Sequence, residues 1–138
     1  MTVRVRAGDT APHLQVGPLK RTDFVRYAGA SNDFNPIHHD DEFARAAGQE
    51  SVFGHGMLGA GLLGSTLTRW FGPGSVARVR VRFVDRVWPG DVLHVEGVLG
   101  AVDDAAGTAE VELSLHREDG TVVVRSDATV WIHGKEVT

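Results

Sequence analysis

Two side chains that can exchange protons near neutral pH lie five positions apart in the segment 27–38. Asp33 supplies a carboxylate and His38 an imidazole, and Pro36 between them pushes Asn35 away from helical dihedral angles. The segment is therefore expected to form a turn. An imidazole titrates near neutrality, and a nearby carboxylate can fix its tautomer. Such a pair can hold one water molecule and take its proton, so the spacing indicates an acid–base pair.

The same two residues also have a purely structural interpretation. Aspartate and histidine are common in loops, and the Asp33 carboxylate can cap the backbone of Asn35 or of the next turn. His38 would then be only a polar loop residue. Spacing alone does not decide between the two interpretations.

A third chemical group follows downstream, where Gly54 and Gly56 flank His55 directly before an expected helix. The first N–H groups of a helix have no partner within it, and they can stabilise an oxyanion. The Gly56 amide is the candidate for that role.

Helices are expected to dominate the first half of the chain, after a short strand over 13–19. One helix begins with Thr22 as its N-cap and ends near 29–31. A short one covers 40–47, and a long one runs over 57–71 and ends at Gly72-Pro73. The long helix contains three glycines, each costing about 1 kcal/mol relative to alanine, so we expect another element packed against its backbone. The three glycines are Gly59, Gly61 and Gly64.

Strands are expected in the second half. Apolar residues alternate with arginines over 78–83, which is the period of a strand, and further strands are expected over 93–99, 109–115 and 122–132. Helices followed by consecutive antiparallel strands predict an α+β domain whose curved sheet can wrap one long helix. We expect one domain over residues 1–138, since that length suits a single core.

Composition excludes several classes of function. The formal net charge of −4 lacks the basic surplus of nucleic-acid binders. The chain has no cysteine, which excludes disulfides, thiolate metal sites and a cysteine nucleophile. Residues 1–9 do not resemble a signal peptide, and the longest weakly polar stretch, 54–67, is too short to span a bilayer. We therefore expect a cytoplasmic protein that binds neither membranes nor nucleic acid.

The segment from Tyr27 to Ala44 resembles the signature of the MaoC-like family, which comprises R-specific enoyl-CoA hydratases and (3R)-hydroxyacyl-ACP dehydratases. The segment 55–58 and the order of 82–83 before 89–91 resemble that family as well. Asn32 stands where the family usually has glycine, and asparagine tolerates left-handed dihedral angles well. The matching residues in the signature are Tyr27, Ser31, Asp33, Asn35, Pro36, Ile37, His38 and Ala44.

The resemblance implies a hot-dog fold with residues 56–70 as its central helix. It implies Asp33 and His38 as the catalytic pair and the Gly56 amide as the group that binds the thioester oxygen. The implied reaction is hydration of trans-2-enoyl thioesters, or dehydration of (3R)-3-hydroxyacyl thioesters, carried on coenzyme A or acyl carrier protein. It calls for no cofactor and no metal. The implied assembly is a homodimer or a heterodimer with another hot-dog chain.

Two alternatives for the function remain open. The chain can be the catalytic subunit of a heteromeric dehydratase that needs a partner chain, or a non-catalytic module that binds acyl thioesters. A hot-dog thioesterase usually presents a carboxylate from its central helix, and 57–70 contains neither aspartate nor glutamate.

Three other patterns are interpreted without a separate function. Two Gly-x-Gly-x-x-Gly motifs begin at Gly54 and Gly59, but no buried strand leads into either, so nucleotide binding is not indicated. The histidines and aspartates near 38–41 and at 55 lack the spacing of zinc motifs. The arginines at 78, 80 and 82 form either a plain solvent- or subunit-facing stripe or a landing surface for the phosphates of the carrier.

Overall fold

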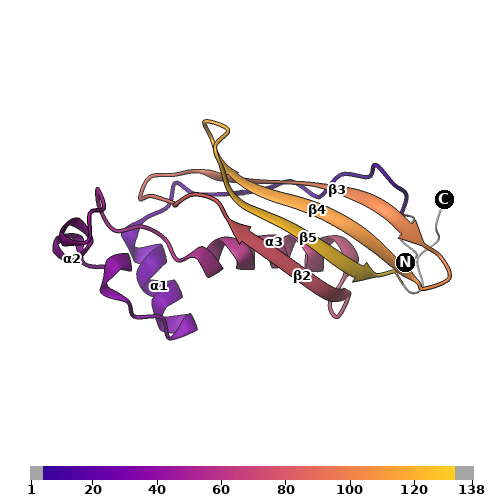
Figure 1. The fold of residues 1–138 in the computed structure, drawn as a ribbon, viewed down its shortest axis with the longest axis horizontal. Coiled ribbons are helices and arrows are strands. Elements are labelled where there is room, and N and C mark those ends of the chain that lie inside the picture. The colour runs from indigo at the N-terminus through magenta and orange to yellow at the C-terminus, as the bar shows by residue number, and fades with distance from the viewer. Residues whose placement is uncertain (1–4, 133–138) are drawn as a thin grey trace.

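The computed structural model describes residues 5–132, so the ends of the predicted domain, 1–4 and 133–138, lie outside the described residues. Helices occupy the first half of the chain and strands the second, as predicted (Figure 1). In chain order the elements are β1 (Leu14–Val16), α1 (Arg21–Ser31), a 3-10 turn η1 (Pro36–His38), α2 (Asp41–Ala46), α3 (Gly56–Phe71), β2 (Val76–Phe83), β3 (Leu93–Asp103), β4 (Thr108–Arg117) and β5 (Val122–Trp131).

The strands form one five-stranded sheet in the order β1-β3-β4-β5-β2, and every neighbouring pair is antiparallel. Helix α3 lies along one face of this sheet, whereas α1 and α2 gather at one end of the molecule (Figure 1). The predicted α+β hot-dog architecture, a long helix against a curved antiparallel sheet, is confirmed. None of the helices within 5–132 is long and apolar enough to cross a membrane.

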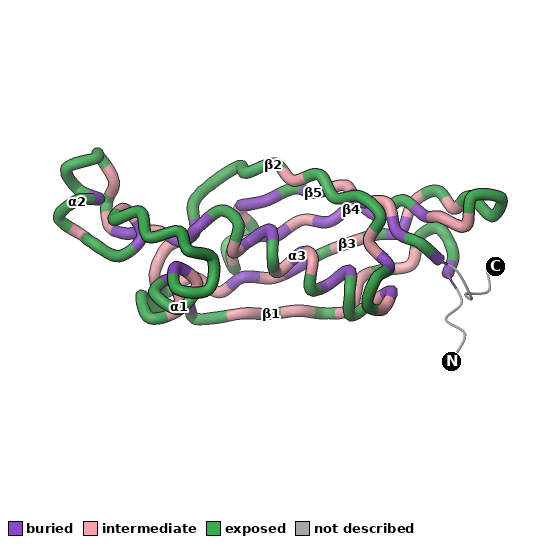
Figure 2. The backbone as a smooth tube through the Cα atoms, turned by 90° about the horizontal axis from the view of Figure 1, so that it is seen from below, coloured by how far each residue is buried: buried purple, intermediate pink, exposed green. Residues whose placement is uncertain are grey.

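The core lies between α3 and the sheet, because strand residues alternate between the two faces. In β4, Val111, Leu113 and Leu115 are buried, while the alternating residues Glu110 and Glu112 are exposed. Leu63 and Leu67 of α3 pack against this inner face and are fully buried. Each such leucine contributes roughly 1.5–3 kcal/mol by leaving water. Figure 2 shows buried segments concentrated on the strands and on one side of α3, with α1 and α2 mostly exposed.

Helix α1 differs from the prediction at its beginning and agrees with it at its end. Its N-cap is Lys20 rather than Thr22, because the Asp23 carboxylate accepts a 2.8 Å hydrogen bond from the Lys20 backbone N–H. The helix ends at Ser31, and Asn32 follows with φ 61° and ψ 22°. Asparagine therefore occupies the left-handed conformation that was expected for it, and the chain turns toward Asp33.

The expectation of close packing at the glycines of α3 is correct for Gly59 and wrong for the other two. A Cβ at Gly59 would lie 3.0 Å from Val124 and 3.1 Å from Leu115, so this face of the helix touches the sheet. Gly61 and Gly64 have no neighbouring atom within 4 Å of a built Cβ. In this single chain α3 is covered on one side only, so the helix period places these glycines away from the sheet.

Strand β2 lies at one edge of the sheet and pairs only with β5 within the described residues. The register aligns Arg82 with Arg125 and Phe83 with Val124, so successive β2 side chains face opposite sides of the sheet. On the outer side, Arg78 and Arg80 lie 3.6 Å and 3.4 Å from a carboxylate oxygen of Asp127. These ion pairs favour the plain interpretation for these two arginines.

Asn32 yields a stability prediction. Replacing Asn32 with valine should lower the free energy of unfolding by roughly 1–2 kcal/mol, because a left-handed conformation brings Cβ too close to the following carbonyl. Asn32→Gly should leave stability nearly unchanged. Thermal or urea denaturation measures both, and Ala30→Val, on the exposed part of α1, controls for a β-branched residue in the helix. Equal stability of the valine and glycine variants would contradict the strained conformation.

Candidate active site

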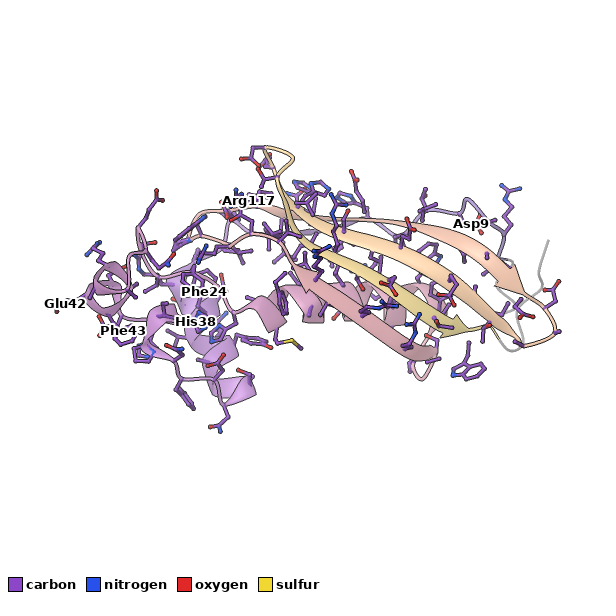
Figure 3. All side chains as sticks on the ribbon, in the orientation of Figure 1. Asp9, Phe24, His38, Glu42, Phe43 and Arg117 are labelled. Carbon is purple, nitrogen blue, oxygen red and sulfur yellow. The ribbon has the colours of Figure 1, made fainter. Side chains whose placement is uncertain are left out.

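The sequence-predicted residues meet where two segments pack together at the beginning of α3. One segment is 32–38, which follows α1 and ends in the 3-10 turn. The other is 53–56, which leads into α3. Figure 3 shows the labelled His38 among the side chains at the end of the molecule formed by α1 and α2, near the first turn of α3. The structure therefore brings Asp33, His38 and Gly56 into one region.

The turn that carries Asp33 and His38 is stabilised by its own polar groups. The Asn35 side chain accepts a 3.1 Å hydrogen bond from the Ile37 backbone N–H, and Pro36 begins the 3-10 turn. The Asn35 carbonyl accepts from the His38 N–H at 3.1 Å. The sequence predicted a turn without specifying the 3-10 geometry, which places the His38 ring inside the molecule.

The two side chains face one another at short range. His38 Nε2 lies 3.8 Å from Asp33 Oδ2, which exceeds a direct hydrogen bond. The His38 side chain is 10% exposed, whereas that of Asp33 is 51% exposed. The pair thus joins a buried imidazole to a carboxylate that is open to solvent in the single chain.

The two oxygens of the Asp33 carboxylate have different surroundings. Oδ1 accepts a hydrogen bond from the Asn35 backbone N–H at 3.3 Å, which is the structural capping role. Oδ2 remains directed toward His38. His38 is buried, so it is not a solvent-exposed loop side chain, and its catalytic role stays a prediction.

The His38 ring is fixed by a backbone carbonyl. Its Nδ1 lies 2.8 Å from the carbonyl oxygen of Phe53, which can only accept, so Nδ1 carries a hydrogen. The neutral ring therefore has its lone pair on Nε2, the nitrogen that faces Asp33. The edge of the Phe53 ring packs against the imidazole, with the ring centroids 5.3 Å apart.

His55 completes the cluster, with its ring stacked on that of His38 at a centroid separation of 3.8 Å and an angle of 27°. Its Nε2 lies 3.0 Å from the Asp33 carbonyl oxygen. Tyr27 packs on His55 as well, with ring centroids 4.8 Å apart. Burial lowers the pKa of His55, although its hydrogen bond to the Asp33 carbonyl opposes that effect.

Gly56 is the first residue of α3, so its N–H has no partner within the helix. The residue lines a cavity of about 300 Å³ together with His55, Phe83 and Val124. A Cβ at Gly56 would lie 3.0 Å from the Phe83 ring, so only glycine leaves the amide and the ring at their present separation. Gly59 and Val84 also line the cavity and add apolar surface to it.

A larger hollow of about 520 Å³ lies on the other face of the sheet, over β3 and β4. Glu96, Glu112 and Arg125 line it, and no residue from the segment 27–56 does. It is therefore separate from the Asp33 and His38 pair.

Asp33, His38 and His55 each offer a metal-ligand atom, and these atoms lie within 4.8 Å of one another. The stacking of the two rings places their lone pairs in nearly parallel planes, so they do not converge on one point. His55 Nε2 and His38 Nδ1 are also occupied by backbone carbonyls. Stacked rings are a poor geometry for two imidazole ligands of one ion, because each lone pair lies in the plane of its own ring.

Two residues of this region have no role predicted from the sequence. His55 enters the sequence prediction only as a possible metal ligand, although it stands directly before Gly56. Phe83 was seen as part of a strand, and its inward direction follows from the alternation of β2. The contact of the Phe53 carbonyl with His38 could not be predicted from the sequence, because every residue has a backbone carbonyl.

Comparison with known proteins identifies the family. The sequence model of the family described as MaoC like domain matches residues 5–120. The (R)-specific enoyl-CoA hydratase of Aeromonas caviae is 30% identical over 133 residues, covering 88% of this chain and 97% of that protein. Other relatives are far longer: the chain spans 9% of peroxisomal multifunctional enzyme type 2 from Mus musculus and 7% of the peroxisomal hydratase-dehydrogenase-epimerase from Saccharomyces cerevisiae, at 36% identity to each.

Solved structures agree with this assignment. The (R)-hydratase from A. caviae involved in PHA biosynthesis superposes with a TM-score of 0.84 at 26% identity, over 93% of this chain and 97% of that chain. The ChsH1-ChsH2 complex from Mycobacterium tuberculosis gives a TM-score of 0.82 at 26% identity, over 95% of this chain and 98% of the matched chain. The predicted resemblance is confirmed: the chain belongs to the MaoC-like family.

Proposed function

We propose that this protein hydrates trans-2-enoyl thioesters, or dehydrates (3R)-3-hydroxyacyl thioesters, carried on coenzyme A or acyl carrier protein. The observation that carries the proposal is the 3.8 Å approach of His38 Nε2 to Asp33 Oδ2, beside a cavity lined by Gly56. The names of the relatives support it, since one is an (R)-specific enoyl-CoA hydratase and another a 3-hydroxyacyl-[acyl-carrier-protein] dehydratase from Arabidopsis thaliana.

The geometry of the pair suits a single water molecule. Neutral His38 presents a lone pair on Nε2, and the ionised Asp33 carboxylate presents only acceptors. A water molecule has two hydrogens, so it can donate one to each group across the 3.8 Å gap. Its oxygen lone pairs then point away from both groups, toward the C3 atom of a bound enoyl thioester. Attack forms the O–C3 bond, and the pair takes a proton from the water.

The second half of the reaction needs an oxyanion site. As the O–C3 bond forms, negative charge moves to the thioester oxygen, and the Gly56 N–H can stabilise it at the beginning of α3. The Asp33 and His38 pair then returns a proton to C2, which completes the addition. Dehydration is the reverse sequence, in which the proton at C2 leaves first and the C3 hydroxyl departs as water.

Dimerisation is the second part of the proposal. Apolar side chains next to the site remain exposed in the single chain, including Phe34 at 59%, Met57 at 57% and Phe83 at 52%. The edge of β2 is unpaired within the described part of the chain. A second hot-dog chain on this side would cover the apolar residues and the half-exposed Asp33. The ChsH1-ChsH2 complex is a two-chain relative, so the partner chain is either a copy or a different hot-dog chain.

The non-catalytic alternative, an acyl-thioester-binding module, is less well supported. Binding an acyl thioester needs the cavity and the Gly56 amide, but it does not need a buried imidazole held in one tautomer opposite a carboxylate. The arrangement of His38 therefore favours catalysis over binding alone.

Loss of either member of the pair should abolish most of the activity. Asp33→Asn and His38→Ala should each lower kcat for crotonyl-CoA hydration about 10²–10⁴-fold, because each removes a positioned acid or base. Asp104→Asn and His13→Ala, both on the exposed surface, are matched controls and should keep the wild-type rate. Wild-type rates in both site variants, with circular dichroism unchanged, would refute the assignment.

The oxyanion role of Gly56 can be separated from its packing. Gly56→Pro deletes the N–H and should lower kcat about 10²–10³-fold, as loss of an oxyanion donor does elsewhere. Proline suits the first position of a helix, and His55 already has the extended conformation that must precede it, with φ −60° and ψ 136°. Gly56→Ala makes the same contact with Phe83 but retains the N–H, so it should keep most of the activity. Equal losses in both variants would assign the effect to packing.

The assembly can be tested with the chain purified alone. Sedimentation and an assay against a panel of enoyl-CoA chain lengths should show a dimer with hydratase activity if two copies complete the site. A monomer that becomes active only with a second hot-dog chain would identify the heteromeric form. An active monomer would contradict the need for a partner.

A further inference from the structure

The mechanism above assigns no step to His55, although this residue is more buried than His38. His55 has 3% of its surface exposed, and His38 has 8%. It lies between the rings of His38 and Tyr27 and directly precedes Gly56. A titratable group in this position either takes part in proton exchange or must be prevented from doing so.

The hydrogen bonds of His55 determine where its proton lies. Nε2 lies 3.0 Å from the Asp33 carbonyl oxygen, which can only accept, so Nε2 carries the hydrogen. Nδ1 is buried and has no hydrogen-bond partner among the described residues. Protonating Nδ1 would create a charge and an unpaired N–H away from water, which is costly. The contacts therefore favour the neutral ring.

The surroundings of His55 shift its pKa in opposite directions. Burial has the largest effect and lowers the pKa of His55; the Asp33 carbonyl and carboxylate raise it, and the neighbouring His38 and His39 lower it. Because the rings of His55 and His38 are 3.8 Å apart, two positive charges would repel one another strongly. This repulsion disfavours a second positive charge on the stack, and burial disfavours it most at His55, the more buried of the two residues.

We infer that His55 is a positioning residue that remains neutral while His38 exchanges protons, and that it holds His38 and the backbone of Asp33 in place. The inference rests on the proposed function. One neutral side chain would then contact both members of the reacting pair, through stacking on one and a hydrogen bond to the other. As the residue before Gly56, it would also connect them to the oxyanion amide.

The tautomer and charge of His55 can be measured directly in the wild-type protein. Nitrogen-15 NMR spectra of the histidine rings, recorded between about pH 5 and 8, distinguish both. The signal that disappears in His55→Gln identifies this residue. We expect a neutral ring with its hydrogen on Nε2 at neutral pH, because burial lowers the pKa of His55. A hydrogen on Nδ1 in the neutral ring, or a protonated His55 ring at neutral pH, would overturn the inference.

Two variants test the consequence for catalysis. His55→Gln retains an N–H donor near the position of Nε2 but loses the stacked ring, whereas His55→Phe retains a stacked ring but loses the donor. His55→Phe should lower kcat about 10²-fold, since a displacement of reacting groups by about 1 Å has that effect. KM should change little, and His55→Gln should be less impaired. Wild-type kcat and an unchanged pH–rate profile in a folded His55→Phe variant would overturn the inference.

Failure of the inference and failure of the proposed function give different results. An inactive wild-type protein against every enoyl thioester would refute the function. The NMR measurement needs no turnover, so it tests the state of His55 whether or not the protein is active on enoyl thioesters.

Discussion

Two hydrogen bonds exchanged between neighbouring segments hold the candidate site together. His38 donates to the carbonyl of Phe53, and His55 donates to the carbonyl of Asp33. Each bond contributes only about 0.5–1.5 kcal/mol net, but losing either leaves a buried imidazole nitrogen without its partner. Because each segment supplies both a donor and an acceptor, neither can shift alone. The stack of the two rings lies between these bonds and depends on both.

The rest of the fold supports this exchange from two sides. The segment 32–38 is directed by the left-handed Asn32 at the end of α1. The segment 53–56 is anchored by a 2.8 Å hydrogen bond from the Gly54 N–H to the Val87 carbonyl, and Gly54 packs closely on the Phe24 ring. The sheet holds α3 through Gly59. The positions of Asp33, His38 and His55 therefore depend on contacts made by residues outside the candidate site.

Much of this arrangement could be predicted from the sequence, because it follows from local rules. Strand alternation, helix ends and the turn at Pro36 are encoded by residues close together in the chain, as was the proximity of Asp33 to His38. The contacts of His38 with Phe53 and of His55 with Asp33 join residues 15 and 22 positions apart, and no periodicity encodes them. The open surroundings of Gly61 and Gly64 were likewise not predictable, since a glycine in a helix looks the same whether or not another element covers it.

The pairing of β2 with β5 has a consequence for how the cavity wall can change. Phe83 faces Gly56, and its neighbour Arg82 faces the opposite side, because the register places Phe83 beside Val124. A slip of one residue would replace the aromatic ring beside Gly56 with a guanidinium. An insertion or deletion of one residue within β2 would thus make this apolar part of the cavity wall cationic, with no change at Asp33 or His38.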